Sequence, residues 1–142
     1  MDSAPTQLNP SQEPKTGQIL DPLVRWEVTV PIRTVSEANK KEHWTVSSKR
    51  HRMQKQHTRL FLQAYAKNVR LPCTIKFTRI APRPLDAHEN LPMAFKYIVD
   101  TVADFLIPGK PAGHADSDPR LKFLYDQEKG DAKEYKIKIT FY

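Results

Sequence analysis

Apolar and polar residues alternate along two stretches of the chain, a pattern typical of β-strands. In VRWEVTVPI the alternating apolar positions are Val24, Trp26, Val28 and Val30. In PCTIKFTRIAPRP they are Cys73, Ile75 and Phe77, and prolines end the pattern. Near the C-terminus, RLKFLYDQE and EYKIKITFY predict two further strands, and KGDAK between them predicts a hairpin-like connection.

Two other stretches have helical spacing. The clearer stripe repeats at i, i+3 and i+4 through Leu91, Ala94, Phe95, Ile98, Val99, Val102, Ala103 and Leu106. It predicts one unbroken helix, with Pro92 in the first turn, where a missing N–H costs little. The earlier stripe contains Met53, His57, Leu60, Phe61, Ala64 and Tyr65 and predicts a helix from about residue 47 to 69. Residues 39–46 are less regular and predict a loop or a separate turn.

The predicted order is strand, helix, strand, helix, strand, strand. This order favours a single small α+β domain over residues 22–142, with a mixed sheet and helices packed on one face. Residues 1–21 are rich in Pro, Ser, Thr and Gln and poor in large apolar side chains. We expect a flexible N-terminal tail there, with an arm that orders on a partner as the alternative.

Composition narrows the class of protein. The 142 residues fit one domain, and the formal charge of +7 favours a polyanionic partner such as nucleic acid over a purely solubilising role. Cys73 is the only cysteine, which excludes an internal disulfide and predicts a small core residue. No signal pattern and no apolar run of about 20 residues is present, so we expect a soluble intracellular protein with no membrane partner.

Basic residues gather ahead of and within the first predicted helix. Between positions 33 and 59 only Glu37 and Glu42 oppose eight Lys and Arg residues. A phosphate backbone explains such an imbalance, because each cationic contact releases counterions, whereas a solvated helix face is the simpler alternative. Trp44 can be a core residue, stack on an unpaired base or brace the basic loop. The candidate DNA-binding residues are Lys40, Lys41, His43, Trp44, Lys49, Arg50, Arg52 and Lys55.

Acidic residues gather at two element ends. Asp86, His88, Glu89 and Asn90 precede the second helix, and Asp116 and Asp118 precede the third strand. A helix start needs only one capping side chain, so a capped polar loop does not explain the whole group. Loops at element ends can meet, and Mg²⁺ takes oxygen ligands, so the pattern is compatible with metal-assisted phosphodiester hydrolysis. Repulsion in such a cluster would raise a carboxyl pKa when no cation is bound.

Lys96 and Asp100 stand four residues apart on the second predicted helix. The simpler interpretation is a solvated ion pair on the polar side of the helix, which contributes a few tenths of a kcal/mol. The functional interpretation places Lys96 near a phosphate beside the metal.

Together these segments resemble a known family. LDAHENLPMAFKYIVDTVADFL, the acidic loop DSDPRL, the closing strands YDQEKG and YKIKITFY, and the upstream SEANKKEHWTVSSKRHR resemble RusA-like Holliday junction resolvases over residues 24–142. The resemblance implies a small homodimeric endonuclease that depends on Mg²⁺, with Mn²⁺ as a substitute, and on no small-molecule cofactor. It implies binding of branched DNA, the four-way junction, and paired nicks in two opposed strands. It also implies a cytoplasmic protein encoded by a bacterium or a phage.

The resemblance also assigns residues. The first acidic motif of the family is Asp-x-Asp-Asn, whose first Asp and Asn match Asp86 and Asn90. The chain has one residue more between them, so either Glu89 or His88 takes the place of the second Asp. Glu89 is preferred because it keeps a carboxylate.

The later catalytic Asp of the family matches Asp118, with Asp116 as a close alternate, and its helix lysine matches Lys96. The implied catalytic residues are Asp86, Glu89, Lys96 and Asp118. The implied metal ligands are Asp86, His88, Glu89, Asp116 and Asp118. Two other functions stay open: a non-catalytic DNA-binding module with the same fold and an altered acidic motif, and a basic structural or adaptor protein.

Overall fold

A computed structural model describes residues 26–37, 41–66, 68–111 and 113–142. The predicted tail, residues 1–21, and the start of the first predicted strand lie outside these ranges. The strands are β1 (Trp26–Val30), β2 (Cys73–Ala81), β3 (Leu121–Lys129) and β4 (Lys136–Phe141). The helices are α1 (Trp44–Tyr65), α2 (Asn90–Ala94), α3 (Lys96–Leu106) and the 3₁₀ turn η3 (Ala115–Ser117).

The four strands form one mixed sheet in the order β1-β4-β2-β3. β2 pairs parallel to β3 and antiparallel to β4, which also pairs antiparallel to β1. The predicted α+β class with a mixed sheet is confirmed. The predicted β3–β4 hairpin is wrong, because β2 lies between these strands and their connection crosses its end. Apolarity explains the order: β2 and β4 bury their alternating side chains and take the centre, whereas β3 is largely exposed at an edge.

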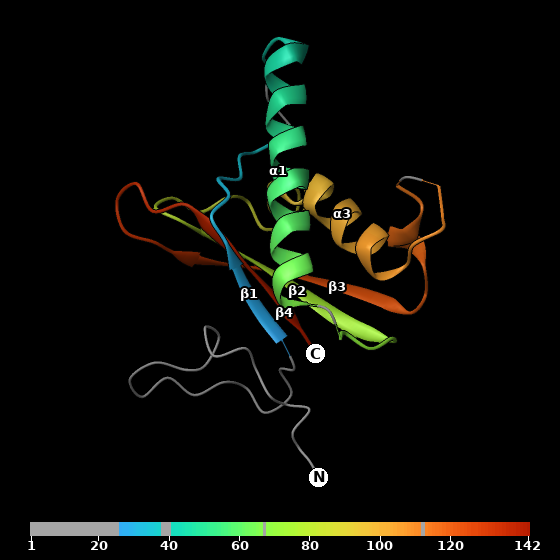
Figure 1. Cartoon of the computed structure of the whole chain (residues 1–142). Helices are drawn as coiled ribbons and strands as arrows, with labels where there is room; N and C mark the ends of the chain where they lie inside the picture. The colour runs from blue at the N-terminus through green and yellow to red at the C-terminus, as the bar shows by residue number, and fades with distance from the viewer. Residues whose placement is uncertain (1–25, 38–40, 67, 112) are drawn as a thin grey trace, which may run out of the picture.

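α1 and α3 pack against each other on one face of the sheet, and the first half of α1 projects beyond it (Figure 1). The core beneath them joins side chains of the sheet to both helices. Its largest fully buried members include Phe77, Phe95, Phe141, Leu62, Ile75, Ile98, Ile137 and Ile139. Cys73 is buried, as predicted, and burial raises the pKa of its thiol. No described helix is long and apolar enough to cross a membrane.

The second predicted helix is two helices, because the chain turns at Phe95 (φ −100°, ψ 0°). The amide of Phe95 donates to the carbonyl of Pro92 (3.1 Å), which tightens the turn. The fully buried Phe95 ring packs 5.5 Å from the ring of Phe77 and 6.0 Å from the ring of Tyr125. The unbroken stripe in the sequence concealed this break, because both helices bury the same face.

The first helix begins three residues earlier and ends four residues earlier than predicted. His43 is its N-cap, and His43 Nδ1 accepts a hydrogen bond from the amide of Thr45 (3.2 Å). Histidine is not among the preferred N-cap residues, so the sequence did not indicate this start.

Candidate nucleic-acid and metal-binding site

The acidic loop before α2, residues 86–90, is held at its base by neighbouring strands. Gln127 of β3 accepts from the amide of Leu85 (2.9 Å) and donates to its carbonyl (2.8 Å). Arg79 of β2 donates to the carbonyl of Arg83 (2.7 Å), and Ser36 donates to Oδ1 of Asn90 (2.9 Å). The fold therefore fixes the entry and the exit of this loop.

Within the loop, one carboxylate also has a local role. Asp86 Oδ2 accepts from the amide of Glu89 (3.0 Å), and the Asp86 carbonyl accepts from Leu91 (2.8 Å). Asp86, His88 and Glu89 are nevertheless exposed. Asp86 therefore closes the turn before α2, although no side chain caps this helix at its N-cap residue Glu89. The turn still presents two carboxylates and an imidazole to solvent.

Asp118 has a different environment, because cations surround its buried carboxylate. Oδ2 accepts from Lys110 Nζ (2.8 Å) and Arg120 Nη2 (3.0 Å), and Oδ1 accepts from Nε and the backbone amide of Arg120 (3.0 and 2.9 Å). Hydrogen bonds from Arg120 and Lys110 hold the pKa of Asp118 well below its usual range. The expectation of a raised pKa through carboxylate clustering is wrong for this residue.

The described parts of the chain do not assemble the predicted set of metal ligands. Within these ranges, no group of three or more His, Cys, Asp and Glu side chains lies where it could hold one metal ion. Asp118 instead stabilises the turn that leads into β3, where its carbonyl accepts from the amide of Leu121 (3.0 Å).

A second group of acidic side chains consists of Asp100 of α3, Asp116 of η3 and Tyr125 of β3, which influence one another electrostatically. Burial raises the pKa of Asp100, the charge of Lys96 opposes this, and the negative charge of Asp116 adds to it. Burial also raises the pKa of Tyr125, and the charges of Asp116 and Asp100 contribute. Asp100 and Asp116 therefore share one electrostatic environment. The sequence indicated Asp100 only as an ion-pair partner of Lys96, because the influence of Asp116 depends on the packing of η3 against α3.

Two lysines from different helices converge on Tyr97 of α3. Lys55 Nζ of α1 lies 5.5 Å and Lys96 Nζ of α3 lies 5.7 Å from the centroid of the Tyr97 ring, within cation–π range. The ring of His51 stacks on the same tyrosine at 3.7 Å. The charge of Lys55 also acts on Asp100. We call Lys55 and Lys96 the Tyr97 lysine pair.

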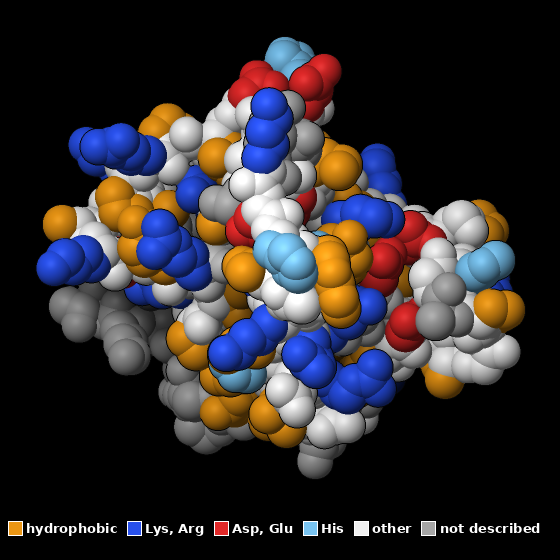
Figure 2. All heavy atoms as spheres, turned by 90° about the horizontal axis from the view of Figure 1, so that it is seen from above, with side chains coloured by type: hydrophobic (Ala, Val, Ile, Leu, Met, Phe, Trp, Pro, Cys, Tyr) orange, Lys and Arg blue, Asp and Glu red, His pale blue; other side chains and the backbone are white. Residues whose placement is uncertain are grey.

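The Tyr97 lysine pair continues into a basic side of α1. Positions 52, 55 and 59 follow one another at helical spacing, so Arg52 and Arg59 lie on the same side of α1 as Lys55, and both are exposed. The 22 residues of α1 contain no Asp or Glu. Figure 2 shows acidic side chains bordered by Lys and Arg side chains in the right half of the view.

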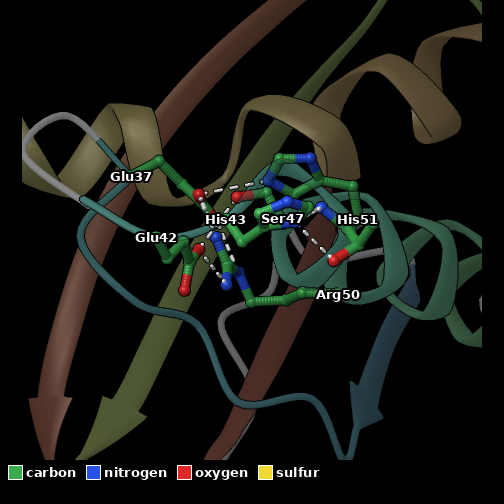
Figure 3. Close-up of polar contacts among 7 residues, drawn as sticks. Glu37, Glu42, His43, Ser47, Arg50 and His51 are labelled. Carbon is green, nitrogen blue, oxygen red and sulfur yellow. Dashed lines mark hydrogen bonds and ion pairs between the residues drawn. The ribbon is translucent and has the colours of Figure 1, made fainter.

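Arg50 is not part of this basic side, because two glutamates bind it (Figure 3). Its guanidinium donates to Glu37 through Nε (3.0 Å) and Nη2 (2.6 Å), and Nη1 lies 2.6 Å from Glu42 Oε1. His51 also contacts Glu37 (3.1 Å), and Ser47 donates to Glu42 (3.0 Å). Burial opposes ionisation of Glu37, but the bonds from Arg50 and His51 lower its pKa. The two acids of the basic segment thus neutralise one arginine.

The other candidate DNA-binding residues that the structure describes lie near the start of α1. Trp44 is 70% exposed, so the core interpretation is wrong, and its ring lies 5.7 Å from that of His43. Lys41 and Lys49 are exposed. Lys40 lies outside the described residues.

Comparisons with known proteins identify no relative. No family model, no curated protein and no solved structure matches the chain. The resemblance to RusA-like resolvases therefore stays a prediction.

Proposed function

We propose that the protein is a Mg²⁺-dependent endonuclease that binds branched DNA, with the four-way junction as its substrate, and that it acts as a homodimer. The observation that carries the proposal is the Tyr97 lysine pair, in which two helices bring ammonium groups together beside Asp100 and Asp116. Cations that bind phosphate and carboxylates that hold a divalent metal are the groups that metal-dependent phosphodiester cleavage uses.

The basic side of α1 supports DNA binding. Arg52 and Arg59 extend the Tyr97 lysine pair along a helix that has no acidic residue, so a phosphate backbone can follow it with release of counterions. Trp44 supports a branched substrate. Its exposed ring at the helix start is available to stack on a base at the branch point, where the continuous stacking of a duplex is interrupted.

The protein can hold Mg²⁺ only if phosphate oxygens of the substrate complete the coordination shell of the ion. Mg²⁺ is commonly held by one or two carboxylates together with substrate phosphates and waters. Asp86 and Glu89 offer two exposed carboxylates in one anchored turn, with His88 between them. Asp116 replaces Asp118 in the proposal as the acidic residue of the second segment, because Lys110 and Arg120 occupy Asp118. A bound Mg²⁺ supplies Lewis-acid activation of the phosphodiester.

The test is cleavage of an end-labelled four-way junction and of a linear duplex of equal length. The reactions contain Mg²⁺, Mn²⁺, Ca²⁺ or a chelator. We expect paired nicks in opposed strands of the junction with Mg²⁺ or Mn²⁺, and binding without cleavage in Ca²⁺. Equal cleavage of both substrates, or cleavage in chelator, would contradict the proposal. Light scattering of the free protein tests the homodimer.

A non-catalytic DNA-binding module is the second candidate. It is favoured by the lack of a three-ligand group within the described ranges and by the cation partners of Asp118. Junction binding with no cleavage in any metal would select this function. Failure to bind DNA at low salt would remove both functions and leave the structural or adaptor protein.

A further inference from the structure

Arg79 of β2 is a buried arginine whose hydrogen-bond partners are neutral. The residue is 6% exposed. Nε donates to Oγ1 of Thr34 (2.9 Å), and Nη1 donates to the carbonyl of Arg83 (2.7 Å). No ion pair to a described carboxylate forms here, in contrast to Arg50, which binds Glu37 and Glu42.

A buried guanidinium with no counter-charge is unfavourable. Hydrogen bonds to two neutral oxygens engage two of its five N–H donors and leave a full positive charge in a poorly solvated place. Burial lowers the pKa of Arg79, the Tyr135 hydroxyl opposes this, and the like charge of Arg33 lowers the pKa further. The local charge is therefore positive, and no carboxylate among the described residues forms an ion pair that compensates it.

A second guanidinium lies at the same end of the sheet. Arg33 is next in sequence to Thr34, the partner of Arg79, and its Cζ lies 4.2 Å from the centroid of the Tyr135 ring. Tyr135 stands just before β4, in which Ile137 pairs with Arg79. The loops of this sheet end lie at the left of Figure 1, and Lys and Arg side chains gather at the left of Figure 2.

We propose that Arg79 and Arg33 form a binding site for a phosphate-type oxyanion, whose charge compensates the buried guanidinium. The planar donor fork of arginine matches the oxygens of phosphate, and a second guanidinium adds charge and geometry. The phosphate belongs either to a nucleic-acid backbone or to a small phosphate compound. Only the nucleic-acid source depends on the proposed function, because the site uses no residue of the Tyr97 lysine pair.

Thermal unfolding of the full chain in sodium phosphate and in sodium chloride, at equal pH and ionic strength, tests the site. Phosphate should raise the Tm of the wild-type protein, since a ligand that binds only the folded state stabilises it. Arg79→Met and Arg33→Met should lose this increment. Arg50→Met is the matched control: it removes a guanidinium that carboxylates already neutralise, and should keep the increment. Equal wild-type Tm values in the two salts, or a full increment in Arg79→Met and Arg33→Met, would overturn the proposal.

Titration with inorganic phosphate gives the affinity directly. Loss of a charged hydrogen-bonding partner should weaken binding by roughly tenfold to a hundredfold in Arg33→Met. Because Arg33 is exposed, this variant keeps the test valid even if Arg79→Met does not fold. Unchanged phosphate affinity in Arg33→Met contradicts the two-arginine site.

Junction binding then distinguishes the two sources. If the anion is a DNA phosphate, Arg33→Met should lower the slope of log affinity against log salt by about 0.9. If it is a small phosphate compound, the slope stays unchanged while the Tm increment is lost. A protein that binds phosphate at this site but no DNA retains the proposal and refutes the proposed function.

Discussion

The acidic loop before α2 and the acidic segment before β3 each place two carboxylates just ahead of a regular element, but these carboxylates have different partners. Asp86 and Glu89 are exposed on a loop held through its flanking residues, with Asp86 also capping the turn. Asp118 is buried and bound by Lys110 and Arg120. A cluster of carboxylates in sequence therefore does not identify the ones available for chemistry. The availability of each carboxylate depends on whether Lys or Arg side chains bind it in the folded chain.

The largest expected effect is on cleavage. The double variant Asp86→Asn, Glu89→Gln should lose junction cleavage by roughly 100-fold or more, because a metal ligand contributes several kcal/mol of transition-state stabilisation. Binding in Ca²⁺-free buffer and the Tm should stay near wild type, since these side chains are exposed. Asp131→Asn, in an exposed carboxylate of the β3–β4 connection, is the control. Wild-type cleavage by the double variant would remove the first loop from the site.

The next effect is on stability. Asp118→Asn should lower the Tm more than Asp116→Asn, because it removes the charge that Lys110 and Arg120 surround. The folded-state pKa of Asp118 is lowered, so its stabilisation is present above the unfolded carboxyl pKa of about 4 and is lost as pH falls further. The Tm of Asp118→Asn should therefore depend less on pH than that of wild type between about pH 4 and pH 2. Parallel Tm curves for the two proteins would show that these ion pairs do not stabilise the fold.

Lys110 and Arg120 bind a carboxylate, whereas Lys55 and Lys96 are proposed to bind DNA phosphates. Lys55→Met with Lys96→Met should lower the salt slope of junction binding by about 1.8, or about 0.9 for each lost phosphate contact. Lys122→Met is the control, since alternation in β3 places Lys122 on the sheet face away from the helices. A slope that falls equally in the control indicates a general charge effect in place of a site.

The smallest effect concerns Asp100. Asp116→Asn removes a negative charge that raises the pKa of Asp100, so this pKa should fall. Carboxyl titration by NMR measures the shift, and Asp131→Asn should leave it unchanged. An unaltered Asp100 titration in Asp116→Asn would show that Asp116 does not influence the pKa of Asp100.

Local patterns predicted the elements of the fold, because alternation and helical spacing report which face of each segment is buried. The break at Phe95 and the placement of β2 between β3 and β4 were not predictable in this way. Both depend on packing between distant segments, such as Phe95 against Phe77 and Tyr125.

For the candidate site, too, the sequence predicted the residues but not their arrangement in space. Residue types indicated Lys55, Lys96 and the acidic loops, but not which charges neutralise each other. Arg50 is a candidate DNA contact by residue type, but Glu37 and Glu42 neutralise it in the folded chain. The resemblance favours Asp118 over Asp116, and its ion pair with Lys110, eight residues earlier, is not predictable from sequence.

The most direct test of the central claim is the rate of junction nicking by Asp118→Asn, expressed per folded molecule at a temperature well below its Tm. We predict a rate within a few-fold of wild type together with a lowered Tm, because this carboxylate stabilises the turn before β3. A variant with wild-type Tm and no nicking would contradict the account and return Asp118 to the metal site.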